Sequence, residues 1–230
     1  MRRFPVPTLP RDSGIVRICG DAAHHLLRVV GVAPGEAVQL YTPDGFAVVA
    51  RLEAVQAGEA LVRTEGPARS LDADQAERWL LLARLKGPAF DVALRMATEL
   101  GVTRIIPVTA ARSVARGDKR ARWDRVAASA VQQCGRGRPP VIAPPSGLHD
   151  ALAMLPSGME TFVCVPGAAR GSGVVSSAAV LVGPEGGWTP DEVASCTQAG
   201  ARPLGLGRWV LLADTAVAAA LARLQAPGGR

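Results

Sequence analysis

A glycine-rich loop near the C-terminus is the stretch whose residue types most clearly favour ligand binding. It reads Gly-Pro-Glu-Gly-Gly at residues 183–187 and follows a small and β-branched run, 177–182, that predicts a short buried strand. Glycine lets another molecule approach the backbone closely, and proline fixes φ. Thr189 and Pro190 then favour the start of a helix. Because ligands of open α/β sheets bind at the carboxyl ends of strands, this order predicts a binding site.

Two further loops strengthen that prediction. Residues 204–209 again run from a strand-like segment through glycines towards a helical stretch at 216–224, and residues 166–171 follow a predicted strand at 161–165. None of these loops carries the Gly-Lys-Ser/Thr of a Walker A motif or the Gly-x-Gly-x-x-Gly of a dinucleotide site. Each alone could be a tight turn without a ligand, but together they predict three walls of one pocket.

The elements that would position these loops form two groups. Residues 78–85, 91–100 and 103–108 read as strand, helix and strand, which at this spacing predicts a parallel βαβ unit. Before residue 70, several short strands and the Asp44-Gly45 turn predict a small β-barrel. We therefore predict an α/β protein with two domains, residues 1–72 and 73–230, joined by a polar link.

The charge of the chain favours a polyanionic partner. The formal net charge is +6 with a pI near 9.9, and Lys86 and Lys119 are the only lysines, so arginine carries nearly all of the positive charge. A dense basic segment lies at residues 112–125, interleaved by Trp123. Phosphate contacts are the preferred interpretation, although a solvated cationic face and an arginine-rich codon bias are alternatives.

Metal and membrane sites are not expected. Cys19, Cys134, Cys164 and Cys196 are far apart in the sequence, which argues against a zinc site and is typical of reduced thiols in a cytoplasmic protein. The basic N-terminus lacks an apolar segment of signal length, and no apolar run is long enough to span a membrane. We accordingly expect a cytoplasmic protein without a metal.

The two C-terminal motifs carry a family resemblance. Leu-Val-Gly-Pro-Glu-Gly-Gly at 181–187 and Leu-Gly-Arg-Trp-Val-Leu-Leu-Ala-Asp-Thr-Ala at 206–216 resemble motifs of the ribosomal RNA uridine-N3 methyltransferases of the SPOUT superfamily. Residues 85–107 and the Gln-Gln-Cys-Gly-Arg segment ending at Arg136 are also similar to the family. Trp209 and Leu212 stand where the family usually has arginine, and Asp214 stands where it has glutamate.

The resemblance implies a fold and a reaction. The implied fold is an N-terminal PUA-like RNA-binding β-barrel followed by a SPOUT α/β domain with a parallel sheet and a deep trefoil knot. The implied reaction is methyl transfer from S-adenosyl-L-methionine to N3 of a uridine in the 16S ribosomal RNA of the small subunit. A homodimer is the expected assembly.

The resemblance also implies roles for individual residues. Arg136 is the expected catalytic residue, as stabiliser of the uridine anion, with Asp214 and Glu185 as weaker candidates for a general base. The expected cofactor-binding residues are Leu181, Gly183, Glu185, Gly186, Gly187, Leu206, Gly207, Trp209, Leu211, Leu212 and Thr215. The expected RNA-binding residues are Arg112, Arg116, Lys119, Arg120, Arg136 and Arg138.

Two alternatives remain at this point. The departures at Trp209 and Leu212 are compatible with an RNA-binding ribosome-assembly factor that has lost catalysis. A SPOUT methyltransferase acting on transfer RNA or on another ribosomal site is the second alternative. Cofactor binding distinguishes the first of these, and mapping of the methylated nucleotide distinguishes the second.

Overall fold

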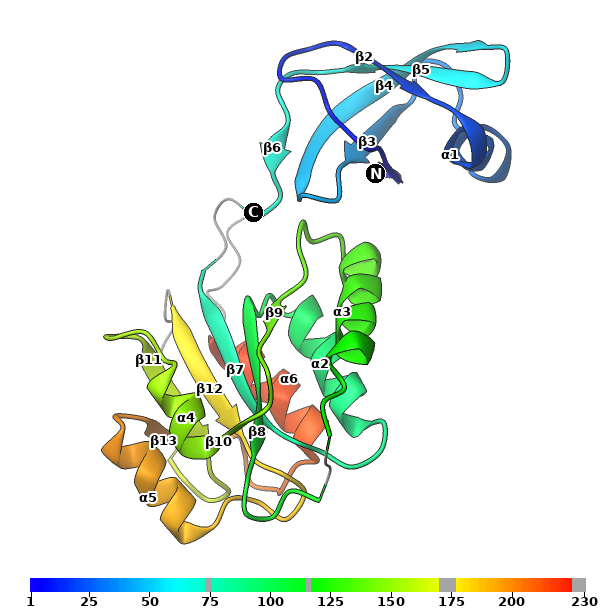
Figure 1. Ribbon diagram of the computed structural model, residues 1–230. Coiled ribbons are helices and arrows are strands. Elements are labelled where there is room, and N and C mark those ends of the chain that lie inside the picture. The colour runs from blue at the N-terminus through cyan, green and yellow to red at the C-terminus, as the bar shows by residue number, and fades with distance from the viewer. Residues whose placement is uncertain (73–75, 115–116, 170–176, 225–230) are drawn as a thin grey trace. The chain divides into compact units, whose positions relative to one another are not determined.

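The computed structural model describes residues 1–72, 76–114, 117–169 and 177–224 (Figure 1). The chain divides into two compact units, each with its own sheet. The first unit comprises Met1–Asp74 together with Gly135–Arg138, and the second comprises Gln75–Cys134 and Pro139–Arg230.

The first unit is built on a six-stranded mixed sheet. Its strand order is β1-β3-β4-β5-β2, with β6 beside β4, and β1–β3 is the one parallel pair among the strands described. The elements of this unit are β1 (Arg3–Pro5), β2 (Ile15–Ile18), α1 (Gly20–His24), the π-helical turn η1 (His25–Val29), β3 (Ala37–Tyr41), β4 (Phe46–Gln56), β5 (Glu59–Thr64) and β6 (Arg69–Ser70).

The sheet of the first unit curls around an apolar core as a half-barrel. Alternate residues of the strands point inward, among them Leu40, Ala50 and Leu52, all of which are buried. Ala23 and Leu26, from the helical stretch of α1 and η1, pack into the same core. This arrangement is more open than the predicted barrel, because that helical stretch contributes to the core and the end strands β1 and β2 are not neighbours in the sheet.

The second unit carries a seven-stranded sheet in which every described pair is parallel, as the βαβ pattern predicted. The strand order is β10-β8-β7-β12-β11-β13, with β9 beside β8. The elements are β7 (Arg78–Ala83), α2 (Ala89–Glu99), β8 (Arg104–Thr109), α3 (Arg120–Cys134), β9 (Val141–Ile142), β10 (Ser146–Gly147), α4 (Leu148–Ala153), β11 (Glu160–Cys164), β12 (Ala178–Val182), α5 (Pro190–Gln198), β13 (Arg202–Leu204) and α6 (Ala213–Leu224).

Helices cover both faces of this sheet, so its central strands β7 and β12 are largely apolar. Leu80 and Leu82 of β7 face a core shared with α2, α3 and α6, whereas Leu81 and Ala83 face a second core shared with α4 and α5 (Figure 1). All five residues of β12 are buried. Because every strand is parallel, the loops that follow β7, β11, β12 and β13 meet at one edge of the sheet, and this edge is where the sequence predicted a pocket.

The segment Gly135–Arg138 was not expected in the first unit. Gly137 N donates to Asp72 Oδ1 at 3.2 Å, and Arg138 Nε donates to the carbonyl oxygen of Asp44 at 2.9 Å. A Cβ on Gly137 would lie only 2.7 Å from Asp72 Oδ2 and 3.0 Å from the Gly45 backbone. The backbones of Gly45 and Gly137 therefore approach each other closely, which favours glycine at both of these positions.

Candidate active site

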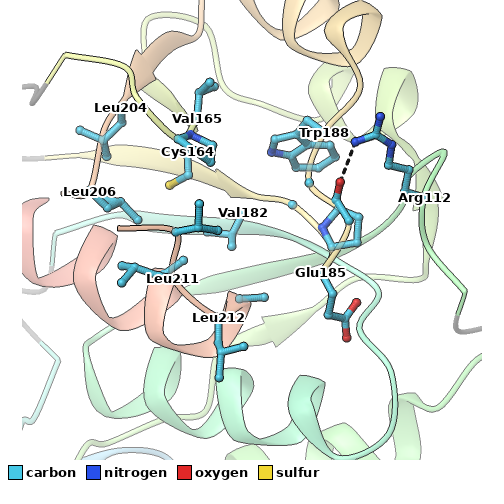
Figure 2. A pocket seen from close by; sticks show the side chains of 18 of the residues that line it. Arg112, Cys164, Val165, Val182, Glu185, Trp188, Leu204, Leu206, Leu211 and Leu212 are labelled. Atoms are coloured by element: carbon cyan, nitrogen blue, oxygen red, sulfur yellow. Dashed lines mark hydrogen bonds between the residues drawn. The ribbon is translucent and has the colours of Figure 1, made fainter. Parts of the chain in front are cut away.

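A cavity of about 500 Å³ lies at the carboxyl edge of the parallel sheet. The loops after β11, β12 and β13 and the start of α6 form its walls (Figure 2). Its size lies within the range of small-molecule sites. The lining residues are Arg112, Cys164, Val165, Pro166, Val182, Gly183, Pro184, Glu185, Gly186, Gly187, Trp188, Val193, Leu204, Leu206, Gly207, Trp209, Val210, Leu211, Leu212, Ala213 and Ala216.

Residues 183–189, here called the glycine loop, form one wall and have a locally determined shape. The indole of Trp188 packs so closely under Gly183 that a Cβ there would lie 3.2 Å from its Cδ1 and Nε1 atoms. The loop ends in the predicted helix start, where the Thr189 side chain accepts from Glu192 N and the Glu192 carboxylate accepts from Thr189 N. This capping box fixes the direction in which the loop enters α5.

Three hydrogen bonds from other loops hold the glycine loop and its helix. Lys86 N, after β7, donates to Glu185 Oε1 at 2.9 Å. Arg112 Nη1, after β8, donates to the Gly186 carbonyl oxygen at 2.6 Å (Figure 2). Ala111 N donates to Glu192 Oε1 at 2.7 Å. The wall is therefore anchored from two neighbouring loops, which reduces the conformational freedom it would lose when a ligand binds.

The opposite wall is apolar. Leu204, Leu206 and Leu211 lie on one side of the cavity, and Trp188 and Arg112 lie on the other (Figure 2). Burial raises the pKa of the Cys164 thiol to about 12. Because the thiolate is the reactive form, this protonated thiol serves as part of the apolar wall and is not a nucleophile at neutral pH.

Among the described residues, the Trp188 indole N–H is a buried polar group without a hydrogen bond. Its Nε1 atom is buried and has no hydrogen-bond partner within the part of the chain that the structure describes. A buried donor of this kind is costly unless it is satisfied, so a polar atom of a ligand that reached it would offset that cost. The combination of exposed glycine backbone, an apolar wall and an orphan indole N–H suits a ligand with a flat apolar part and polar substituents.

Most of the predicted cofactor-binding residues are brought together at this cavity. Gly183, Glu185, Gly186, Gly187, Leu206, Gly207, Trp209, Leu211 and Leu212 line it. Leu181 does not line it, because it is fully buried within β12. Thr215 does not line it either, since it lies exposed in the first turns of α6.

The three catalytic candidates occupy different places. Glu185 lines the cavity, but its carboxylate already accepts from Lys86 N. Asp214 is outside the lining and accepts from Thr215 N at 2.7 Å, in the first turn of α6. Arg136 belongs to the first unit, whereas every residue that lines the cavity belongs to the second.

The predicted RNA-binding residues are also spread over both units. Arg112 lines the cavity, and Lys119 and Arg120 are exposed at the start of α3. Hydrogen bonds from Arg120 hold the pKa of Asp118 below its ordinary value. Arg138 belongs to the first unit, and Arg116 lies outside the described residues.

Sequence reasoning missed several residues of the cavity. Trp188 follows the glycine motif directly, so its position in the chain was a usable signal. Cys164 is the last residue of β11 and Val165 follows it, and the loop after them was predicted as a wall. The contact of Arg112 with Gly186 spans 74 residues, and no local pattern reveals such a contact.

Comparisons with known proteins place the chain in a family. A model described as an RNA methyltransferase domain matches residues 73–225. The ribosomal RNA small subunit methyltransferase E of Mycobacterium bovis is 32% identical over 95% of this chain and 88% of its own length. The protein of the same name from Synechocystis is 30% identical over 88% of this chain and 70% of its own length.

A solved structure agrees with the sequence comparison over the whole chain. Ribosomal RNA small subunit methyltransferase E from Neisseria gonorrhoeae, bound to S-adenosyl methionine, is 31% identical and superimposes with a TM-score of 0.74. The match covers 96% of this chain and 95% of that one. These matches agree with the parallel sheet and its cavity, and they show that the chain belongs to the ribosomal RNA small subunit methyltransferase E family of RNA methyltransferases.

Proposed function

We propose that the protein transfers a methyl group from S-adenosyl-L-methionine to N3 of a uridine in 16S ribosomal RNA of the small subunit, in the cytoplasm. The observation that carries this proposal is the cavity at the carboxyl edge of the sheet, between the glycine loop and the loop after β13. The residues present fit the cofactor, since they offer glycine backbone, an apolar wall and the orphan N–H of Trp188. When bound, the cofactor supplies an electrophilic methyl group.

Removal of the N3 proton and stabilisation of the resulting anion would depend on residues of the protein. N3 of uridine carries a proton near neutral pH, and the proton must leave before N3 can attack. We assign stabilisation of the resulting anion to the Arg136 guanidinium. Asp214 and Glu185 stay weaker candidates for the base, because both carboxylates are already hydrogen-bonded to backbone N–H groups. N3 lies on the pairing edge, so the uridine must be unpaired or flipped.

One departure from the family motif, at Trp209, has a local compensation. Trp209 stands where the family usually has arginine, but the Arg208 guanidinium lies 4.9 Å from the centre of its ring. A positive charge is therefore present one residue earlier and is held by a cation–π contact.

The proposal also covers the roles of the two domains, the path of the chain and the assembly of the protein. We assign RNA binding to residues 1–72 and methyl transfer to residues 73–230, with the C-terminal chain threaded as a trefoil knot. We also propose a homodimer. Its support is an exposed apolar stretch at the mouth of the cavity, where Trp209, Val210 and Leu212 have exposed fractions of 73%, 81% and 73%.

Two measurements test the function. Calorimetry should give micromolar binding of S-adenosyl-L-methionine that is competed by S-adenosylhomocysteine. Primer extension on ribosomal RNA from treated small subunits should then stop at one uridine, because N3-methylation blocks base pairing. Failure to bind cofactor, even with small subunits present, would favour the non-catalytic assembly factor. A stop elsewhere, or on transfer RNA, would favour a SPOUT methyltransferase of other specificity.

Paired substitutions of Glu185 test whether it is a base or an anchor of the glycine loop. Glu185→Gln keeps an acceptor oxygen for Lys86 N, so we expect turnover and cofactor affinity within about threefold of the original. Glu185→Ala removes the acceptor and should weaken cofactor binding about fivefold to tenfold. Calorimetry and a methyl-transfer assay measure both variants. Loss of turnover in the glutamine variant, with cofactor binding intact, would instead identify Glu185 as the base.

A further inference from the structure

Arg112 stands where the cavity meets the basic segment, residues 112–125. Its side chain lines the cavity, and its stem covers Gly186, where an added Cβ would lie 3.3 Å from Arg112 Cδ. The residue is nevertheless exposed to solvent. Arg112 therefore belongs to the basic segment and also contacts the glycine loop.

The guanidinium of Arg112 has unused binding capacity. It presents five N–H donors in a planar fork, and the bond to the Gly186 carbonyl oxygen uses Nη1. The edge formed by Nε and Nη2 suits a bidentate phosphate contact. Both edges can be satisfied at the same time, because they point in different directions in one rigid plane.

The charge of Arg112 is also uncompensated, unlike that of Arg120 and Arg122 in the same segment. Arg120 pairs with Asp118, and Arg122 pairs with Asp91. Among the described residues, no carboxylate lies within ion-pair distance of Arg112. An exposed, uncompensated guanidinium at the mouth of the cavity is therefore suited to an incoming polyanion.

We propose that Arg112 couples the binding of RNA to the binding of the cofactor, an inference that rests on the proposed function. An RNA phosphate on the Nε–Nη2 edge fixes the guanidinium, which in turn holds the Gly186 carbonyl and the wall of the cofactor cavity. Cofactor binding then requires less ordering of the glycine loop, so RNA tightens it. By linkage, the cofactor tightens RNA binding by the same factor. Arg112 is in this account a positioning residue.

The coupling is measured as a ratio of two dissociation constants. S-adenosylhomocysteine is titrated into the protein by calorimetry, alone and in the presence of unmethylated small ribosomal subunits. This probe carries no transferable methyl group, so no turnover disturbs the equilibrium. For the original protein we expect the dissociation constant to fall about tenfold when the subunits are present.

Arg112→Lys separates coupling from simple support of the loop. The three N–H donors of an ammonium radiate from one nitrogen, so lysine cannot place a planar bidentate fork on a phosphate while it keeps the bond to the Gly186 carbonyl. We expect the ratio of the two dissociation constants to fall to about one, whatever change the substitution makes to the dissociation constant without RNA. Arg202→Lys is the matched control, because Arg202 is exposed, pairs with Glu160 and does not line the cavity. Its ratio should equal that of the original protein.

The outcomes distinguish this inference from the proposed function. If the original protein binds no S-adenosylhomocysteine under either condition, the proposed function fails. If it binds the probe equally well with and without subunits, or if Arg112→Lys keeps the original ratio, the coupling role of Arg112 is overturned and the proposed function stands. A drop in affinity without RNA that leaves the ratio unchanged would show that Arg112 only supports the loop.

Discussion

Gly205→Ala is expected to lower the free energy of unfolding by about 3 kcal/mol and to abolish cofactor binding. Gly205 follows β13, and its N–H donates to the Ala169 carbonyl oxygen at 2.9 Å. An added Cβ would lie 1.9 Å from the Ala168 carbonyl oxygen and 2.8 Å from its carbonyl carbon. The atoms in the way belong to the backbone and cannot rotate away as a side chain could. Either the segment of Gly205 or the segment of Ala168 must therefore move.

That movement would affect the cavity directly. Val165 N donates to the Leu204 carbonyl oxygen, and Val165, Leu204 and Leu206 all line the cavity. Urea unfolding followed by tryptophan fluorescence measures stability, and calorimetry measures cofactor binding.

Gly207→Ala is the matched control for Gly205→Ala, because nothing lies within 4 Å of its added Cβ. Its stability should change by less than about 0.5 kcal/mol. Equal stability of the two variants would contradict the close approach at Gly205.

Arg136→Ala is expected to reduce turnover by a factor of about 100 to 1,000, with little change in cofactor affinity. The physical reason is that the guanidinium would stabilise charge that appears on the uridine only after its N3 proton has left. The cavity residues belong to a different unit, so removing this side chain leaves the cavity lining intact. Single-turnover methylation of small subunits measures the rate, and calorimetry measures cofactor binding.

Arg138→Ala is the control for Arg136→Ala. Arg138 belongs to the same segment, but its Nε atom is already bonded to the Asp44 carbonyl oxygen. We expect this variant to raise the KM for RNA with turnover at saturation maintained. If Arg136→Ala keeps the original turnover at saturating RNA, the proposed role of Arg136 is wrong. If both variants lose cofactor binding, the segment supports the fold and not the chemistry.

The parts of the fold that sequence could predict are those governed by short-range rules. The capping box at Thr189 joins residues three positions apart, so residue type and spacing were sufficient to place the start of α5. The parallel sheet followed in the same way from the alternation of apolar strands with an amphipathic helix. The glycine loops were recognisable because few other residues tolerate close backbone approach.

The parts that sequence could not predict depend on contacts between distant segments. Arg112 was assigned to RNA from the charge of its segment, and its bond to Gly186 is visible only in the folded chain. The segment that contains Arg136 is held by another such contact, because Gly137 N donates to Asp72, which lies 65 residues earlier in the chain. Likewise, the compensation of Trp209 by Arg208 depends on side-chain direction, which residue order does not specify.

The membership of Gly135–Arg138 in the first unit has a consequence for how such a protein can evolve and be synthesised. The chain passes between the two units after residues 74, 134 and 138, so neither unit is a contiguous stretch of gene. Recombination at the single boundary after residue 74 would transfer the second unit together with four residues, 135–138, that belong to the first. During translation, the N-terminal half stays incomplete until about 60 further residues have left the ribosome. Exchange of the first unit within this architecture therefore requires matched changes at two separate places in the gene.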